Sequence, residues 1–306
     1  MRMILITEFM DEDAVELLRR SFDVVYDPAL ADRQDDLPAM MPGVNALIVR
    51  NRTQVTEALL DAAPDLRCVG RLGVGLDNID VENCKRRGVA VYPANGANNV
   101  SVAEYVVTAA MMLLRGAWFA NAAMLAGKWP RQACAGREIG GKVLGLVGFG
   151  AIARDTARLA AGLGMQVRFH DPYVAADVPE PGAARLELAD LLATSDVVSL
   201  HVPLTPGTRH LMGRDAIAAM KPGAILINAA RGGVVDEAAL GDALRKGRLG
   251  GAALDVFETE PLTGEAAAKF SGVPNLVLTP HVAGVTEESN VRVSAMIADA
   301  ILNHLS

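Results

Sequence analysis

Short apolar runs alternate along the chain with longer stretches in which apolar residues recur at helical spacing. In the first third, the runs that predict strands occupy residues 3–7, 22–26, 46–49, 68–70 and 89–91. An amphipathic helix opened by acidic residues is expected over 11–20. Because strands that alternate with helices favour a parallel sheet covered on both faces, this part predicts an α/β domain that ends near residue 98.

The alternation resumes after one long apolar segment. Residues 100–127 are expected to form a helix that links two domains, and Ser101 with Glu104 predicts a capping box at its start. The later strands are predicted at 143–147, 165–170, 197–200, 224–227, 251–254 and 276–278. The helices among them are expected at 151–162 and from near Glu187, Arg214 and Asp236.

The last predicted helix, 287–305, decides the domain organisation. Its apolar positions are Val291, Met296, Ile297 and Ile301. The helix follows the second domain and is expected to fold back on the first. The predicted domains are therefore a discontinuous one, 1–98 with 285–306, and a continuous one, 99–284.

Composition narrows the classes of function. The chain has 306 residues, 51% of them hydrophobic, and a formal net charge of −7, so we expect two domains and no surface for nucleic acid. The longest membrane-like segment, 102–114, carries Glu104 and is too short to span a bilayer. The N-terminus turns acidic at Glu8, too soon for a signal peptide. Neither a membrane partner nor export is expected.

The cysteines bear on metal binding and compartment. Cys68, Cys84 and Cys134 lack the spacing of metal ligands, so no metal site is predicted. A sparse and odd number suits reduced thiols that pack as small hydrophobes, which predicts a cytoplasmic protein.

The clearest motif joins the strand at 143–147 to the next helix. Gly148 allows a tight turn, Gly150 lets the backbone approach a pyrophosphate, and Ala153 is small enough for the helix to pack on the strand. The N–H groups of the helix start would face the phosphates. Taken alone, the motif also fits a plain strand-to-helix turn.

A carboxylate after the next strand supports dinucleotide binding. Asp171, followed by Pro172, stands about 20 residues after Gly150, where an acid is expected to hold the ribose hydroxyls. The same carboxylate would repel a 2′-phosphate, so NAD is favoured over NADP.

Three polar loops follow late strands, at 228–233, 255–261 and 279–284, and carry Arg231, Glu260 and His281. Because ligands bind beyond the carboxyl ends of parallel strands, these side chains are expected to converge beside the nicotinamide. A histidine can move the proton, a carboxylate can fix its tautomer, and an arginine can clamp a substrate carboxylate. Singly, Arg231 also fits a surface or capping residue, Glu260 a solvated acid, and His281 a satisfied core histidine.

The order of these motifs resembles the D-isomer-specific 2-hydroxyacid dehydrogenases, the group that includes D-3-phosphoglycerate dehydrogenase. The matching stretches are 148–153, 201–205, 228–236, 255–261 and 279–281, with 50–53 and 71–77 in the first domain. The resemblance implies two doubly wound parallel-sheet domains, a flavodoxin-like substrate domain and a Rossmann NAD domain, with the active site in the cleft. It also implies a homodimer formed through the NAD domain, partly through the long linking helix.

The resemblance assigns roles to individual residues. Arg231 would bind substrate, His281 would be the acid/base, and Glu260 would pair with His281. The residues implied at the cofactor are Gly148, Gly150, Ala151, Ile152, Asp171, Pro172, His201, Val202, Pro203, Thr208, Ala229, Ala230, Asp255, Gly284 and Ser101. The residues implied at the substrate are Arg50, Asn51, Arg52, Val74, Gly75, Asn98, Arg231 and His281.

The predicted activity is the NAD-dependent interconversion of a D-2-hydroxy acid and its 2-oxo acid. Arg50, Arg52 and Arg71 suggest a second anionic group on the substrate, as in 3-phosphoglycerate, 3-sulfolactate or a dicarboxylate, although each also fits a solvated or structural role. Asn51 stands where many relatives have serine. Two alternative functions stay open: a reductase of glyoxylate or hydroxypyruvate, and an NAD(H)-sensing binding protein like the co-repressors. Formate dehydrogenase is disfavoured because those enzymes carry glutamine in place of Glu260.

Overall fold

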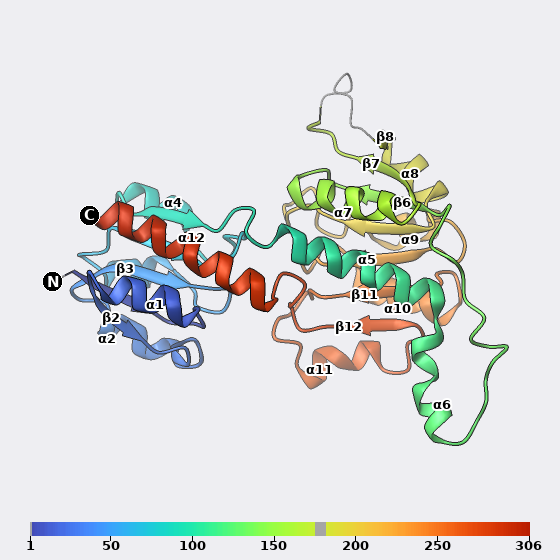
Figure 1. Ribbon diagram of the computed structural model, residues 1–306, viewed down its shortest axis with the longest axis horizontal. Helices are drawn as coiled ribbons and strands as arrows, with labels where there is room; N and C mark the ends of the chain where they lie inside the picture. The colour runs from blue at the N-terminus through green and yellow to red at the C-terminus, as the bar shows by residue number, and fades with distance from the viewer. Residues whose placement is uncertain (1, 175–181) are drawn as a thin grey trace. The chain divides into compact units, whose positions relative to one another are not determined.

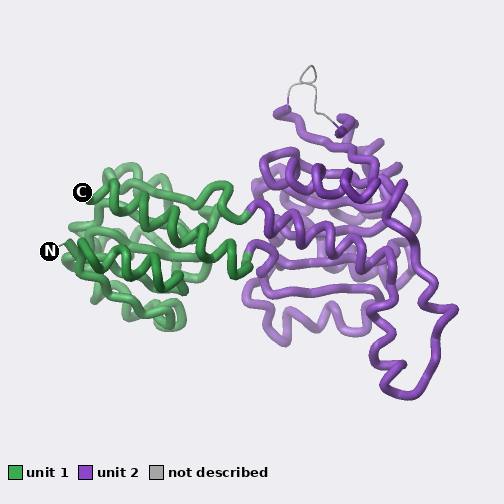
Figure 2. The backbone as a smooth tube through the Cα atoms, viewed as in Figure 1, with its two compact units in different colours: residues 1–98, 285–306 green, residues 99–284 purple. Residues whose placement is uncertain are grey.

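The computed structural model describes residues 2–174 and 182–306. The chain divides into two compact units, residues 1–98 with 285–306 and residues 99–284 (Figure 2). Each unit is built around a parallel sheet with helices on both faces, so the predicted fold class, α/β with two doubly wound sheets, is confirmed.

Unit 1, residues 1–98 with 285–306, has its strands in the order β2-β1-β3-β4-β5, the flavodoxin-like order. Its strands are β1 (Met3–Ile6), β2 (Asp23–Tyr26), β3 (Val44–Val49), β4 (Cys68–Arg71) and β5 (Ala90–Pro93). Its helices are α1 (Glu12–Arg19), α2 (Leu37–Met40), α3 (Glu57–Asp61), α4 (Val81–Arg86) and α12 (Glu287–Leu305), with 3-10 turns η1 (Leu30–Asp32) and η2 (Gln34–Asp36).

Alternate residues of these strands face two separate cores. Ile4 and Ile48 pack with α1 and α12 on one face, whereas Leu5 and Leu47 pack with α2, α3 and α4 on the other. Both faces of this sheet are therefore buried, which explains the continuous apolar runs in the sequence.

Helix α12 spans the predicted residues, but part of its predicted apolar face is wrong. Val291 and Met296 are exposed. The buried stripe is Val293, Ile297, Ala298, Ile301 and Leu305. Gly70 on β4 selects this face, since a Cβ there would lie only 2.6 Å from the Ile297 side chain. The helix packs where the sheet has no side chain, and this close approach is not visible in the helix sequence.

Unit 2, residues 99–284, has its strands in the order β12-β11-β10-β9-β6-β7-β8, the Rossmann order with one strand added after the sixth (Figure 1). Its strands are β6 (Val143–Val147), β7 (Gln166–His170), β8 (Ala183–Arg185), β9 (Val197–Leu200), β10 (Ile225–Asn228), β11 (Gly251–Leu254) and β12 (Leu276–Leu278). Its helices are α5 (Asn99–Arg115), α6 (Asn121–Leu125), α7 (Ala151–Gly162), α8 (Leu188–Thr194), α9 (Arg214–Ala219), α10 (Glu237–Arg245) and α11 (Gly264–Ala267), with 3-10 turns η3 (Ala117–Ala120) and η4 (Ala268–Phe270).

The two faces of this sheet also have separate cores. Helices α5 and α7 cover one face, and α8, α9 and α10 cover the other. All of its strands are parallel, so their carboxyl ends lie along one edge, and the loops that carry the predicted site start there.

The long linking helix differs from its prediction. The helix expected over 100–127 ends at Arg115, because Gly116 adopts a left-handed backbone with φ 63°. Helix α5 begins at Asn99, so Ser101 lies in its first turn and the predicted capping box is wrong. Strand β8 is an element that the sequence pattern did not predict.

Residues 116–136 leave the body of unit 2 as an arm and return beside the end of α5 (Figure 1). The Arg137 backbone N–H donates to the Leu114 carbonyl at 2.8 Å and closes the base of this arm. Among the described residues, no single helix is long and apolar enough to cross a bilayer; α5 and residues 117–125 meet that criterion only together, as a pair bent by 62°.

Candidate active site

The glycine turn between β6 and α7 has room for a phosphate group. Gly148 has φ 89°, and a Cβ there would lie 2.6 Å from the His201 carbonyl oxygen, so the chain requires glycine for its own packing. Gly150 differs, because a Cβ there would meet no atom within 4 Å. The start of α7 also has no side-chain cap. The turn therefore fits a dinucleotide, whose pyrophosphate would occupy the space beside Gly150.

Asp171 lies directly after β7 and next to this turn. One carboxylate oxygen accepts from the Phe149 N–H and the other from the Tyr173 N–H, each at 2.8 Å. Each carboxylate oxygen can accept more than one hydrogen bond, so Asp171 holds the turn in place and can still accept from ribose hydroxyls.

The loop after β9, which carries His201, lies beside the glycine turn. The His201 N–H donates to the Val147 carbonyl at 2.7 Å, and its Nε2 lies 3.0 Å from the Ser199 hydroxyl. Burial lowers the pKa of His201 to about 4, so the imidazole is neutral near pH 7. The Thr208 hydroxyl donates to the Pro203 carbonyl at 2.6 Å and holds the loop closed. These contacts give His201 and Thr208 a shaping role.

Glu260 and His281 meet, although they come from different loops. The Glu260 Oε2 lies 2.7 Å from the His281 Nδ1, and the Phe257 N–H donates to Oε1 at 2.9 Å. Burial would raise the pKa of Glu260, but the hydrogen bond and charge of His281, the Phe257 N–H and the Arg231 charge together lower it. An ionised Glu260 thus fixes the imidazole through Nδ1 and leaves Nε2 for a substrate.

Arg231 belongs to the same cluster. The buried Asn228 side chain donates to the Arg231 carbonyl at 2.9 Å and accepts from the Ala230 N–H at 3.1 Å, which fixes the loop. A Cβ on Gly232 would lie 1.7 Å from the Phe257 carbonyl oxygen, so this loop lies against the one that carries Glu260. The structure therefore brings Arg231 to the Glu260–His281 pair. Asn228 is a positioning residue that the sequence reading gave no role.

Most of the other predicted cofactor contacts follow strands of this sheet or lie at the start of α7. Asp255, at the end of β11, is buried and binds the loop that carries His281. Ala229 and Gly284 are partly buried and Pro172 is exposed. On the helices, Ala151 is exposed, Ile152 is partly buried, and Ser101 is buried in α5.

In unit 1, the predicted substrate loop is held by Glu8, to which the sequence analysis gave no role in the site. The Glu8 carboxylate is buried and accepts from the backbone N–H groups of Arg50 (2.8 Å), Arg52 (3.2 Å) and Thr53 (3.0 Å). Its position just after β1 was the only available signal, since its partners are backbone atoms.

The arginines of unit 1 are in different environments. The Arg50 guanidinium donates to the Asn290 side chain at 2.9 Å, and Arg52 is paired with Asp32. Burial lowers the pKa of Arg50, and the nearby Glu8 charge opposes that shift. Arg50 is therefore a partly desolvated cation with a neutral side-chain partner, whereas the charge of exposed Arg52 is balanced by Asp32.

The glycine loop after β4 is shaped by Arg71. Its Nη1 occupies the place that a Cβ of residue 73 would take, so Gly73 is needed for the guanidinium to lie over the loop. Val74, Gly75 and Asn51 are partly buried. The Oδ1 of Asn98 is buried and has no hydrogen-bond partner among the described residues. This acceptor, in the last residue of unit 1 before the chain crosses to unit 2, suits a ligand contact.

Comparison with known proteins places these features in a family context. Residues 107–283 match the family model of the D-isomer specific 2-hydroxyacid dehydrogenase NAD binding domain. The chain is 57% identical over 300 residues to the (S)-sulfolactate dehydrogenase of Chromohalobacter salexigens (97% of this chain, 96% of the relative). It is 38% identical to the hydroxypyruvate reductase of Thermotoga maritima (97% and 96%). The structure of D-lactate dehydrogenase from Aquifex aeolicus with NAD and lactic acid superposes with a TM-score of 0.82 at 29% identity (99% and 95%).

Proposed function

Because the chain belongs to the D-isomer specific 2-hydroxyacid dehydrogenase family, it is an NAD-dependent oxidoreductase that interconverts a 2-hydroxy acid and its 2-oxo acid, and we propose that the hydroxy acid is (S)-3-sulfolactate. The observation that carries the proposal is the 57% identity to the (S)-sulfolactate dehydrogenase of C. salexigens over nearly the whole of both chains. The hydroxypyruvate reductase relative, at 38%, supports the reaction class but not this substrate.

The S descriptor agrees with a D-specific family. In lactate the carboxylate outranks the methyl group, and the D form is R. In 3-sulfolactate the sulfur atom makes the CH₂SO₃⁻ arm outrank the carboxylate, which exchanges two priorities without moving any group. The S enantiomer of sulfolactate therefore has the spatial arrangement of a D-2-hydroxy acid.

A sulfonate also suits the charge of unit 1, for which we propose the substrate-binding role. Arg50 is partly desolvated and has Asn290 as a neutral partner, so an added anion would stabilise its charge. Arg71 lies over the glycine loop after β4, which carries the predicted substrate residues Val74 and Gly75. We assign the C3 sulfonate to Arg50, with Arg71 of the same unit adding positive charge, whereas the charge of Arg52 is balanced by Asp32.

We propose that Arg231, Glu260 and His281 carry the chemistry. Bound NAD supplies the hydride acceptor for oxidation of the C2 carbon. His281 takes the hydroxyl proton on Nε2 during oxidation and returns it during reduction, because Glu260 occupies Nδ1. Arg231 makes paired hydrogen bonds to the C1 carboxylate and orients the carbon for hydride transfer. In unit 2, the glycine turn and Asp171 hold the pyrophosphate and the ribose.

A substrate panel tests the proposal. We expect kcat/KM with NAD to be at least about tenfold higher for (S)-3-sulfolactate than for its R enantiomer, D-3-phosphoglycerate and D-lactate, measured by NADH absorbance. Arg50→Met should lower kcat/KM for (S)-3-sulfolactate while leaving D-lactate turnover near the parent value. Arg33→Met, which removes an exposed arginine paired with Asp27, is the matched control. Equal kcat/KM for sulfolactate and D-lactate in the parent enzyme would exclude a sulfonate subsite.

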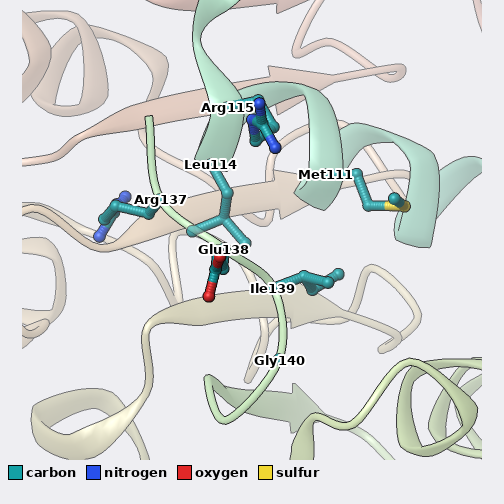
Figure 3. Close-up of a pocket in the computed structure, with 7 residues that line it drawn as sticks. All are labelled: Met111, Leu114, Arg115, Arg137, Glu138, Ile139 and Gly140. Atoms are coloured by element: carbon teal, nitrogen blue, oxygen red, sulfur yellow. The ribbon is translucent and has the colours of Figure 1, made fainter. Parts of the chain in front are cut away.

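We further propose that the protein is a homodimer formed through unit 2. The arm, residues 116–136, contains no buried residue. Its large exposed apolar side chains are Trp118, Phe119, Met124, Leu125 and Trp129. At its base, Met111, Leu114, Arg115, Arg137, Glu138, Ile139 and Gly140 line a cavity of about 310 Å³ (Figure 3). Exposed apolar area of this kind is typical of a protein interface, and a second copy is the partner that the family suggests.

We also propose that the protein is cytoplasmic and binds neither nucleic acid nor a membrane. Cys68, Cys84 and Cys134 are thiols without a disulfide, which supports a reducing compartment such as the cytoplasm. The net charge of −7 supports the view that neither nucleic acid nor an anionic membrane surface is a partner.

A further inference from the structure

Three side chains form a chain of hydrogen bonds from helix α5 to the loop that carries His281. The Tyr105 hydroxyl lies 2.6 Å from the Thr279 hydroxyl, which in turn donates to the Asp255 Oδ1 at 2.6 Å. Thr279 has a single hydroxyl hydrogen, and Asp255 receives it. Tyr105 is therefore the donor to Thr279, and the order of donation is Tyr105 to Thr279 to Asp255.

Asp255 is the point at which this chain reaches the loop. Its Oδ1 also accepts from the Val282 N–H, and its Oδ2 accepts from the Ala283 N–H, both at 2.8 Å. Its carbonyl accepts from the His281 N–H at 2.8 Å. His281 itself has φ 56°, a left-handed conformation that a residue other than glycine keeps only when its surroundings enforce it. The contacts of Asp255 on both sides of His281 enforce it here.

Tyr105 joins the two segments of unit 2 that connect it to unit 1. Helix α5 begins where the chain first passes from unit 1 to unit 2, and the loop 279–284 ends where it passes back. The hydrogen bond from Tyr105 to Thr279 thus ties together, inside unit 2, the two segments that lead to the other unit. Burial raises the pKa of Tyr105, and the Asp255 charge adds to the rise while the Thr279 hydrogen bond opposes it, so the hydroxyl stays a donor at working pH.

We propose that Tyr105 is a positioning residue for catalysis, which acts through Thr279 and Asp255 to hold the imidazole of His281 against Glu260. The inference rests on the proposed role of His281 and adds a residue of α5 to it. Tyr105 touches neither Glu260 nor His281 in any hydrogen bond of the structure, so its effect must pass through the Thr279–Asp255 pair.

A double-mutant cycle on the full-length enzyme tests this path. Tyr105→Phe should lower kcat by about three- to tenfold, the effect of one misplaced hydrogen bond, with KM for the hydroxy acid and NADH affinity by fluorescence little changed. Thr279→Val should lower kcat by a similar factor, and the Tyr105→Phe, Thr279→Val double variant should be no slower than Thr279→Val alone. Thr279→Ser keeps the hydroxyl and should restore most of the parent rate.

Two further variants separate the possible failures. Tyr92→Phe removes a partly buried hydroxyl that bonds His304 in unit 1, and it should leave kcat unchanged. His281→Ala should be nearly inactive. If His281→Ala is inactive while Tyr105→Phe keeps the parent kcat, or if the Tyr105 and Thr279 effects add as independent losses, the positioning proposal is overturned and the proposed function stands. If His281→Ala keeps a high rate, the proposed function is itself wrong.

Discussion

At the scale of single residues, buried and half-buried carboxylates fix the loops that carry the candidate site. Glu8, Asp171 and Asp255 each follow a strand and accept two or three backbone N–H groups, at least one of them from a loop of the candidate site. Glu260 does the same with Phe257 and adds His281. Hydrogen bonds to an ionised acceptor are stronger than neutral ones, so each acid holds its loop at a defined distance from the sheet edge.

The Glu260–His281 pair leads to a prediction about pH. The folded protein lowers the pKa of the Glu260 carboxyl below its value in the unfolded chain. The ionised carboxylate therefore contributes fully to the free energy of unfolding above the unfolded pKa. That contribution is lost as pH falls through the lower, folded pKa. Glu260→Gln keeps the shape of this side chain but removes its charge. We expect kcat for 2-oxo acid reduction to fall at neutral pH, and the loss of activity that the parent enzyme shows at acid pH, as Glu260 becomes protonated, to be absent.

The control is Glu258→Gln, which changes a nearby acid paired with His210 and Lys269 instead of His281. Its pH–rate profile should match that of the parent enzyme. A parent-like pH–rate profile and kcat in Glu260→Gln would mean that the charge of Glu260 does not support the proposed role of His281.

Residue types and their order were enough to predict that Arg231, Glu260 and His281 would meet, because all three follow neighbouring strands of one parallel sheet. The roles assigned to them stay a prediction. Glu8 and Asn228 could not be found in the same way. Their partners are backbone N–H and carbonyl groups, which every residue carries, so no sequence pattern marks them. The link from Tyr105 to Thr279 spans 174 positions and depends on how α5 packs against β10 and β11 of the sheet.

At the scale of elements, small residues set how closely neighbouring segments approach. Gly70 admits α12 to the sheet of unit 1, and Gly232 admits the Arg231 loop to the Phe257 backbone. A side chain at either position would overlap a neighbouring atom at 2.6 Å or less. Such sites explain why element types were predictable from periodicity while the buried face of α12 was not.

The glycine turn gives a test in which folding and cofactor binding separate. Gly148→Ala should lower the melting temperature, because its Cβ would meet the His201 carbonyl at 2.6 Å and its φ of 89° disfavours alanine. Gly150→Ala should leave the melting temperature within about a degree or two of the parent, since a Cβ there meets nothing within 4 Å. The same change should weaken NAD binding by about tenfold or more, because the methyl group takes the place of the pyrophosphate.

Differential scanning calorimetry and NADH fluorescence titration measure the two effects. Gly162→Ala, at the end of α7 in similarly open space, is the control for an added methyl group on this helix. Gly162→Ala should retain the parent affinity for NADH. Parent-like NADH affinity in Gly150→Ala would place the pyrophosphate elsewhere.

At the scale of the whole molecule, the chain forms two α/β units of the same architecture. Both sheets are parallel in the described residues, both have a separate core on each face, and both carry the candidate residues on loops after their strands. The arm of unit 2 is the segment that this scheme does not explain. In the sequence it continued the apolar pattern of α5, so a single helix was predicted, and the break follows from the left-handed backbone at Gly116.

The arm carries the last prediction, which concerns oligomeric state. Leu125 and Trp129 are 83% and 77% exposed, and no core cluster among the described residues includes them. Burying two such side chains between copies would contribute on the order of several kcal/mol, enough to shift a dimer equilibrium by orders of magnitude. We expect the parent protein to sediment as a dimer at micromolar concentration and Leu125→Asp, Trp129→Asp to sediment as a monomer.

The matched control places the same change on an exposed apolar residue outside the arm. Val291→Asp, on α12 of unit 1, removes a side chain that is 50% exposed and should leave the protein dimeric. Because no residue of the arm belongs to a hydrophobic core in the part of the chain that the structure describes, the arm variant should also keep the parent melting temperature when both are compared as monomers at high dilution. A parent protein that sediments as a monomer, or an arm variant that stays dimeric, would show that these apolar side chains serve some other contact.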